Sequence, residues 1–79
     1  MTDRAMAQLR ELKEYEFRAE CLEVQEDESE LMHYTILFKN NYVDGLDLLA
    51  IMDAGFRILE IQADNGVLHV TVKEYEYGD

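Results

Sequence analysis

The feature that most constrains the fold is a sequence that occurs twice in the chain. Leu22-Glu23-Val24-Gln25 reappears as Leu59-Glu60-Ile61-Gln62, and Leu31-Met32-His33-Tyr34-Thr35-Ile36 reappears as Val67-Leu68-His69-Val70-Thr71-Val72. A Phe-Arg pair precedes each copy, at 17–18 and at 56–57. Similarity at a fixed spacing indicates a repeated structural unit. Strands draw on few residue types, so chance is the alternative explanation; we interpret the match as an internal duplication.

The spacing of apolar residues predicts a helix before each copy. Over 3–14 they recur every three or four positions, on one helical face: Ala5, Met6, Leu9 and Leu12. Over 45–54 a nearly uninterrupted apolar run follows Asp44, a good N-cap residue, and ends before Gly55, which suits a left-handed stop. A helix that is apolar nearly all round is buried on more than one side. We therefore expect the second helix to contact the sheet and also either the first helix or another chain.

Alternating apolar and polar residues predict four strands, over 16–25, 31–38, 57–63 and 67–76. Asn65-Gly66 predicts a tight type I′ turn in the second hairpin, because both residues tolerate positive φ. The turn of the first hairpin, over 26–30, is longer and highly charged.

The segment between the first helix and the first strand has two interpretations. A phase shift between Ala19 and Leu22 predicts a bulge in a strand. The alternative extends the first helix through Ala19 and Leu22, which fit the three-to-four-residue spacing of its apolar face. Phe17, Cys21 and Val24 do not fit that spacing, and the match to the second copy favours the strand.

These elements make two αββ units, at about 2–39 and 43–77, within one domain that spans 1–79. We expect an α+β fold in which a four-stranded antiparallel sheet carries both helices on one face. The predicted core is Leu9, Leu12, Leu22, Val24, Tyr34, Ile36, Leu49, Met52, Phe56, Leu59, Ile61, Leu68, Val70 and Val72. The predicted uncovered face carries Glu23, Gln25, His33, Thr35, Glu60, Gln62, His69 and Thr71.

Composition narrows the setting and the partners. Eighteen acids against seven bases give a net charge of −11, which disfavours phosphate backbones and anionic membrane surfaces. The lone Cys21 allows no intramolecular disulfide, and with no signal peptide evident we expect a cytoplasmic location. The longest apolar run, 48–52, is too short to span a bilayer. A small core without a disulfide or metal favours self-association, so we expect a homodimer.

No motif in the sequence indicates catalysis, and we expect neither enzymatic activity nor a cofactor. The four glycines are scattered, and no nucleophile elbow or phosphate-binding loop is present. Glu23 with His33, and Glu60 with His69, are candidate metal ligands if they are cross-strand neighbours. Polar residues that alternate outward on a repeated strand explain the same pattern, and a flat solvated face lacks an enclosing second shell. We therefore predict no metal site.

Acidic residues are the strongest functional signal. A docking surface for a basic partner is predicted at Glu20, Glu23, Glu26, Asp27, Glu28, Glu30, Glu74, Tyr75, Glu76 and Tyr77. Acids spaced along strands can mimic phosphates, and tyrosines offer rigid contact area. The resulting hypothesis is a non-enzymatic protein-binding module, in its sharpest form a phage or mobile-element inhibitor of the anti-CRISPR or anti-restriction type. The alternatives are a structural or regulatory homodimer, with acidity as an adaptation to salt, and a metal- or small-ligand-binding domain.

Overall fold

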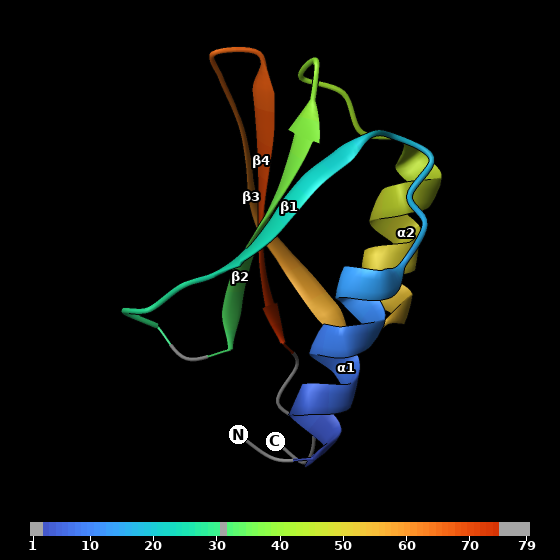
Figure 1. Ribbon diagram of the computed structural model, residues 1–79, viewed down its shortest axis with the longest axis vertical. Coiled ribbons are helices and arrows are strands. Elements are labelled where there is room, and N and C mark those ends of the chain that lie inside the picture. Colours follow the sequence, from blue (N-terminus) through green and yellow to red (C-terminus); the bar gives the residue numbers. More distant parts are fainter. Residues whose placement is uncertain (1–2, 31, 75–79) are drawn as a thin grey trace.

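The computed structural model describes residues 3–30 and 32–74, with side chains from residue 7 onward. The elements in chain order are α1 (Asp3–Glu14), β1 (Cys21–Glu26), β2 (His33–Lys39), α2 (Gly45–Asp53), β3 (Phe56–Asp64) and β4 (Val67–Glu74). The four strands form an antiparallel sheet in the order β1-β2-β4-β3, and both helices lie on one side of it (Figure 1). The α+β fold expected from the sequence is confirmed.

The core forms where the two central strands meet the helices. Every second residue of β2 and β4 is buried on the helix side, and Ile36 of β2 lies directly opposite Val70 of β4. Leu12 of α1 and Ile51 of α2 cover these strands and are almost fully buried. The remaining buried apolar side chains are Leu9, Ala19, Tyr34, Phe38, Phe56, Leu68 and Val72. The sheet therefore has one apolar face, which the two helices cover.

The turn and helix-end residues behave as the sequence predicts. Asn65 and Gly66 both have positive φ, 51° and 80°, as the two central positions of a type I′ turn require. Asp44 is the N-cap of α2, and its side chain accepts a hydrogen bond from the backbone N–H of Leu46. Gly55 follows the helix with a φ of 97°, which a residue with a side chain adopts only at a cost. These residues fix both ends of α2 and the short hairpin.

The strand β1 begins at Cys21, five residues later than predicted, because the preceding backbone binds to α2. The N–H groups of Arg18 and Ala19 donate hydrogen bonds to the two carboxylate oxygens of Asp47, at 2.7 and 2.9 Å. The same carboxylate accepts from the N–H of Asp44 at 3.3 Å, which completes a capping box. Asp47 is fully buried. Because α1 ends at Glu14, the alternative of one continuous helix through Leu22 is wrong.

Both edge strands carry a β-bulge at matched residues. The pairing shifts between Cys21 and Glu23 in β1 and between Ile58 and Glu60 in β3, so Leu22 and Leu59 are the extra residues. The predicted bulge is therefore confirmed, at the end of the interval where the sequence placed it.

The second strands of the two units do not follow the sequence match. Val24 pairs with Ile36, and its counterpart Ile61 pairs with Val70. The sequence match instead aligns Ile36 with Val72, two residues further along. The similarity between β2 and β4 is therefore out of register with the hairpins, and strand alternation alone accounts for it. The internal duplication stays a prediction.

Five residues predicted in the core are about half exposed: Leu22, Leu49, Met52, Leu59 and Ile61. Leu22 and Leu59 occupy the bulges, where the alternation is broken. Leu49 and Met52 lie on the side of α2 opposite Asp47 and Ile51, the buried residues of that helix. Val24 is partly buried against the core.

The exposure of Ile61, which was predicted to be buried, has a different cause. Ile61 lies on the helix side of the sheet, opposite Val70. It belongs to the outermost strand, however, and its partner Val70 on the central strand β4 is fully buried, so the cover of the core stops short of this edge of the sheet.

Two isoleucines test this difference in burial with the same substitution. Ile36 is fully buried and Ile61 is 46% exposed, although both lie on the helix side of the sheet. We expect Ile36→Ala to lower the free energy of unfolding by about 2 to 5 kcal/mol, and Ile61→Ala by about 1 kcal/mol or less. Urea unfolding in dilute solution measures both. Equal losses would show that the end of β3 is covered.

The Asp47 carboxylate should contribute strongly to stability. Asp47→Ala removes the acceptor of two interior N–H groups and the capping box, so we expect the free energy of unfolding to fall by about 2 to 4 kcal/mol. Asp53→Ala is the matched control, because Asp53 is exposed in the last turn of the same helix. Its removal should change stability by about 0.5 kcal/mol or less. Equal effects in urea unfolding would contradict the role assigned to Asp47.

Candidate functional site

The densest group of acids lies along one edge of the sheet. We call Glu20, Glu23, Glu26, Asp27, Glu28 and Glu30 the acidic edge. All six are exposed, and the eleven residues from 20 to 30 include no Lys or Arg. They follow β1, the edge strand next to β2, into the turn of the first hairpin. This turn projects away from the helices, at the left of Figure 1.

Two acids of the acidic edge, Asp27 and Glu20, have local partners of different kinds. Asp27 accepts hydrogen bonds from the backbone N–H and the hydroxyl of Ser29, at 2.9 and 2.7 Å. These hydrogen bonds lower the pKa of Asp27 below its ordinary value, so this side chain stays ionised. Glu20 lies 3.7 Å from the ammonium of Lys39, but both side chains are more than half exposed. Such an exposed pair contributes little to stability.

Three acids of the acidic edge share one shallow depression. Glu23, Glu26 and Glu28 line an open hollow of about 400 Å³ together with Val24, Gln25 and Lys13. Glu23 and Glu26 lie on opposite sides of the sheet by their pairing with Leu37 and Tyr34. The hollow therefore wraps around the outer edge of β1, and its acids surround a short apolar contact at Val24.

The structure separates Glu74 from the acidic edge. Glu74 is only 3% exposed and lies on the helix side of β4, because it continues the alternation of Val70 and Val72. Burial, with the negative charges of Glu74 and Glu26, raises the pKa of the Tyr34 hydroxyl. Glu74 is therefore part of the interior and offers no carboxylate to a partner. The other predicted contact residues of this segment, Tyr75, Glu76 and Tyr77, lie outside the described residues.

The uncovered face of the sheet holds the predicted polar residues but does not assemble a metal site. His33 pairs with Lys73, whereas Glu23 pairs with Leu37 at the other end of β2. His33 instead meets Glu30, with 3.4 Å between Nε2 and Oε2. Within residues 3–30 and 32–74, no three His, Cys, Asp or Glu side chains come together as metal ligands.

Charge on this face is mixed. Lys39, Arg57 and Lys73 occupy it together with Glu23, Glu60 and Asp64, as the strand register shows. The uncovered face is therefore close to neutral, and the excess of negative charge lies elsewhere, above all on the acidic edge.

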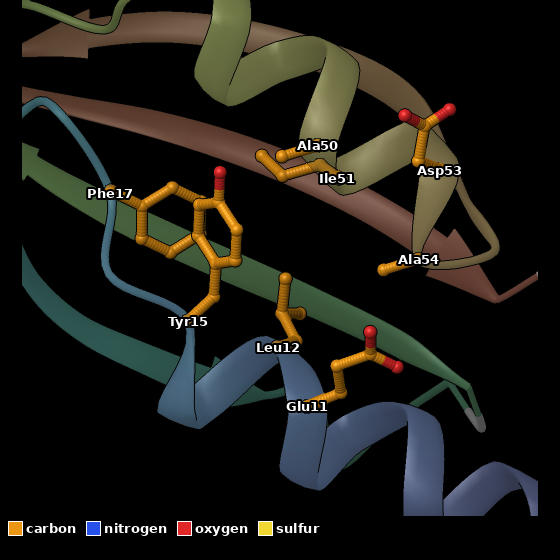
Figure 2. Close-up of a pocket in the computed structure, with 8 residues that line it drawn as sticks. All are labelled: Glu11, Leu12, Tyr15, Phe17, Ala50, Ile51, Asp53 and Ala54. Carbon is orange, nitrogen blue, oxygen red and sulfur yellow. The ribbon is translucent and has the colours of Figure 1, made fainter.

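A groove of about 280 Å³ separates the two helices (Figure 2). Its floor is apolar, formed by Leu12 from α1 and Ile51 from α2. Tyr15 and Phe17 close one end with an edge-to-face contact, their ring centroids 4.8 Å apart. The only charged residues of the lining are acids, Glu11 and Asp53, and both are exposed. This lining suits an apolar group that carries a neighbouring positive charge.

Cys21 lies partly buried at the start of β1, and its thiol contacts the backbone carbonyl of Glu23 at 3.8 Å. Burial, with a smaller contribution from the negative charge of Asp47, raises the pKa of the thiol. The thiolate is the reactive form of cysteine. The environment therefore suppresses reactivity at neutral pH.

The sequence interpretation missed the structural role of Asp47. The predicted helix over 45–54 has Asp44 as its N-cap, and no role was assigned to Asp47 within it. The spacing Asp44-x-x-Asp47 is that of a capping box, and an acid in an otherwise apolar helix was a second signal. Neither signal indicates which backbone segment the carboxylate binds.

Comparisons with protein-family models, curated proteins and solved structures give no match to this chain. Neither helix in the described part of the chain has the length and apolar character needed to cross a membrane.

The raised pKa of Cys21 predicts slow alkylation. Because the folded thiol holds its proton to higher pH, the rate of reaction with iodoacetamide should rise at a higher pH in the native protein than in the same protein unfolded in urea. Mass spectrometry of the alkylated fraction across a pH series measures both midpoints. A native midpoint at or below that of the unfolded chain would contradict the environment described for this thiol.

Proposed function

We propose that this chain is a protein-binding module that docks on a basic partner through the acidic edge. The single observation that carries the proposal is the placement of six exposed acids along one edge strand and its projecting turn, in a segment of the sequence, 20–30, that contains no Lys or Arg. A surface with one sign of charge attracts an oppositely charged partner over several ångströms and speeds encounter. The partner should present Lys and Arg residues along a matching ridge.

Geometry favours contact at the edge over contact at the uncovered face. Glu23, Glu26 and Glu28 converge on one depression, with Val24 as an apolar contact within it. The outer backbone of β1 is also open to a partner strand. A basic segment that lies along β1 would meet carboxylates on both sides of the strand.

Protection against aggregation is the competing explanation. Charged residues on an edge strand discourage pairing with another sheet, and a solvated edge needs no partner. The two explanations differ in one measurable respect: only docking makes the affinity for a second molecule depend on these carboxylates.

The sharpest form of the proposal is an inhibitor that occupies a nucleic-acid-binding surface. Carboxylates spaced along a strand would replace phosphates, as expected of an anti-restriction or anti-CRISPR protein of a phage or mobile element. In this form, duplex DNA or RNA should displace the chain from its partner. A partner that binds the chain and nucleic acid together would support docking without mimicry.

Charge reversal at the turn should abolish docking. We expect Glu26→Lys, Asp27→Lys and Glu28→Lys together to remove binding to the partner captured by the wild-type chain from its native host, with the fold retained because the turn is exposed. Binding of the wild type should weaken steeply as salt rises, mainly through slower association. Surface plasmon resonance measures both effects, and circular dichroism checks the fold.

The matched control reverses three acids on the helix side: Glu11→Lys, Glu14→Lys and Asp53→Lys. All three are exposed, and the change in net charge is identical. If overall charge alone drives association, both triple variants will lose affinity equally. Unchanged affinity in the turn variant would overturn the proposal.

A further inference from the structure

The second edge of the sheet has the features of an interface between two copies of the chain. β3 is a nine-residue edge strand, and its residues from Leu59 to Asp64 are all exposed. On its helix side it presents Ile58, Ile61 and Ala63, which pair with buried residues of β4. The edge at β1 carries the acidic edge, whereas β3 exposes apolar side chains, and an exposed apolar edge strand invites pairing.

The backbone of β3 is oriented for such pairing. Asp64 and Val67 flank the two-residue turn, and residues in that position bond to each other across the hairpin. Along a strand, successive residues direct their N–H and C=O groups to one neighbouring strand and then to the other, and their side chains alternate between the two faces in step. Ile61 and Ala63, on the opposite face from Asp64, therefore direct their N–H and C=O groups to the open edge. The bulge at Leu59 shifts the alternation by one residue, so Ile58 does the same.

One antiparallel register makes β3 complementary to itself. With a two-fold axis at Ile61, that residue lies opposite Ile61 of the second copy, and Ile58 lies opposite Ala63 of the second copy. The bulge residue Leu59 then lies between two paired positions, Ile58 and Glu60, and has no partner of its own in the second copy. Ile61, Ile58 and Ala63 all lie on the helix side of the sheet. On the uncovered face, Arg57 lies opposite Asp64 of the second copy, and the axis repeats this ion pair. Arg57 and Asp64 of the second copy form a pair without backbone hydrogen bonds between them, and in such pairs the side chains lie closer together than in hydrogen-bonded pairs.

Arg57 lies where an acid of a second copy would be favourable. Within one chain it lies directly opposite Lys73 on the uncovered face, and like charges in cross-strand positions are destabilising. Its other flank is the open edge, where the register above brings a carboxylate. The charges of β3 and its apolar side chains therefore favour the same contact with a second copy.

The second helix extends the same interface. The groove with α1 is lined by Ala50, Ile51, Asp53 and Ala54, which place α1 on one side of α2. At 100° per residue, Leu49 and Met52 lie on the other side, and both are about half exposed. Because α2 contacts β3, the outermost strand, these exposed side chains belong to the helix nearest the open edge. A second copy joined at β3 would bring its own α2 toward these residues.

We propose that the chain forms a symmetric homodimer through β3, giving a continuous eight-stranded sheet with the two β1 strands at its far ends. Seven strand spacings separate those ends, about 34 Å, so the two acidic edges lie far from the interface and from each other. Net charge opposes association, and salt should strengthen the dimer by screening it. The proposal is independent of docking through the acidic edge.

Charge swaps test the register. Sedimentation velocity at moderate salt should show a dimer for the wild type, with dissociation about tenfold easier for Arg57→Asp or Asp64→Arg alone. The double variant restores both pairs and should regain nearly wild-type affinity. Circular dichroism confirms the fold of each variant. A wild-type monomer at high concentration, or a double variant weaker than both single ones, would overturn the proposal.

Cross-linking provides a second measurement with a matched control. In a Cys21→Ser background, Ile61→Cys places two thiols on the two-fold axis, and oxidation should link the subunits. Gln62→Cys, the next residue on the same exposed strand, lies opposite Glu60 of the second copy. Its two thiols are then too far apart to bridge, since a disulfide needs Cα atoms within about 7 Å. Equal cross-linking of both variants would contradict this register.

Discussion

The fold depends most on one buried carboxylate. Asp47 accepts hydrogen bonds from the N–H groups of Arg18 and Ala19 while it caps its own helix. A buried charge is tolerated only when hydrogen bonds satisfy it, and here three backbone donors do so. The contact joins the first αββ unit to the second across 28 and 29 residues of chain. It holds the linker in place, which sets where β1 begins.

The position of β1 in turn determines which residues lie along that edge of the sheet. With the linker held against α2, the strand starts at Cys21, and the acids that follow are distributed along an outer edge and its turn. The opposite edge, β3, exposes apolar residues, with Arg57 and Asp64 near its two ends. The same small sheet thus has one edge suited to a basic partner and one suited to its own copy.

The sequence predicted the fold well where local chemistry determines the structure. Asn65-Gly66, Asp44 and Gly55 fixed the short turn and the ends of α2, and period-two alternation placed the central strands. It predicted burial poorly at Leu49, Met52 and Ile61, because alternation and helical spacing assign a face but not what covers it. The partners of Asp47 were also beyond prediction, since they depend on tertiary contacts between distant segments.

The candidate surfaces also divide into features that local sequence predicts and features that depend on tertiary structure. Exposure of the acids in the first turn followed from their density, whereas the burial of Glu74 did not, because it continues the apolar alternation of β4 into the interior. The exposure of β3 could be predicted only with the strand order in hand. That order places β3 outermost, although it directly follows the most apolar helix in the sequence.

Residue-resolved amide hydrogen exchange by NMR at two protein concentrations tests most directly the claim that the two edges have different roles. The account predicts that the amides of Ile58, Ile61 and Ala63 exchange slowly in concentrated samples and quickly in dilute ones. The edge-facing amides of β1 should exchange quickly at both concentrations until a basic partner is added. Concentration-independent exchange along β3, or protection that appears along β1 without a partner, would contradict it.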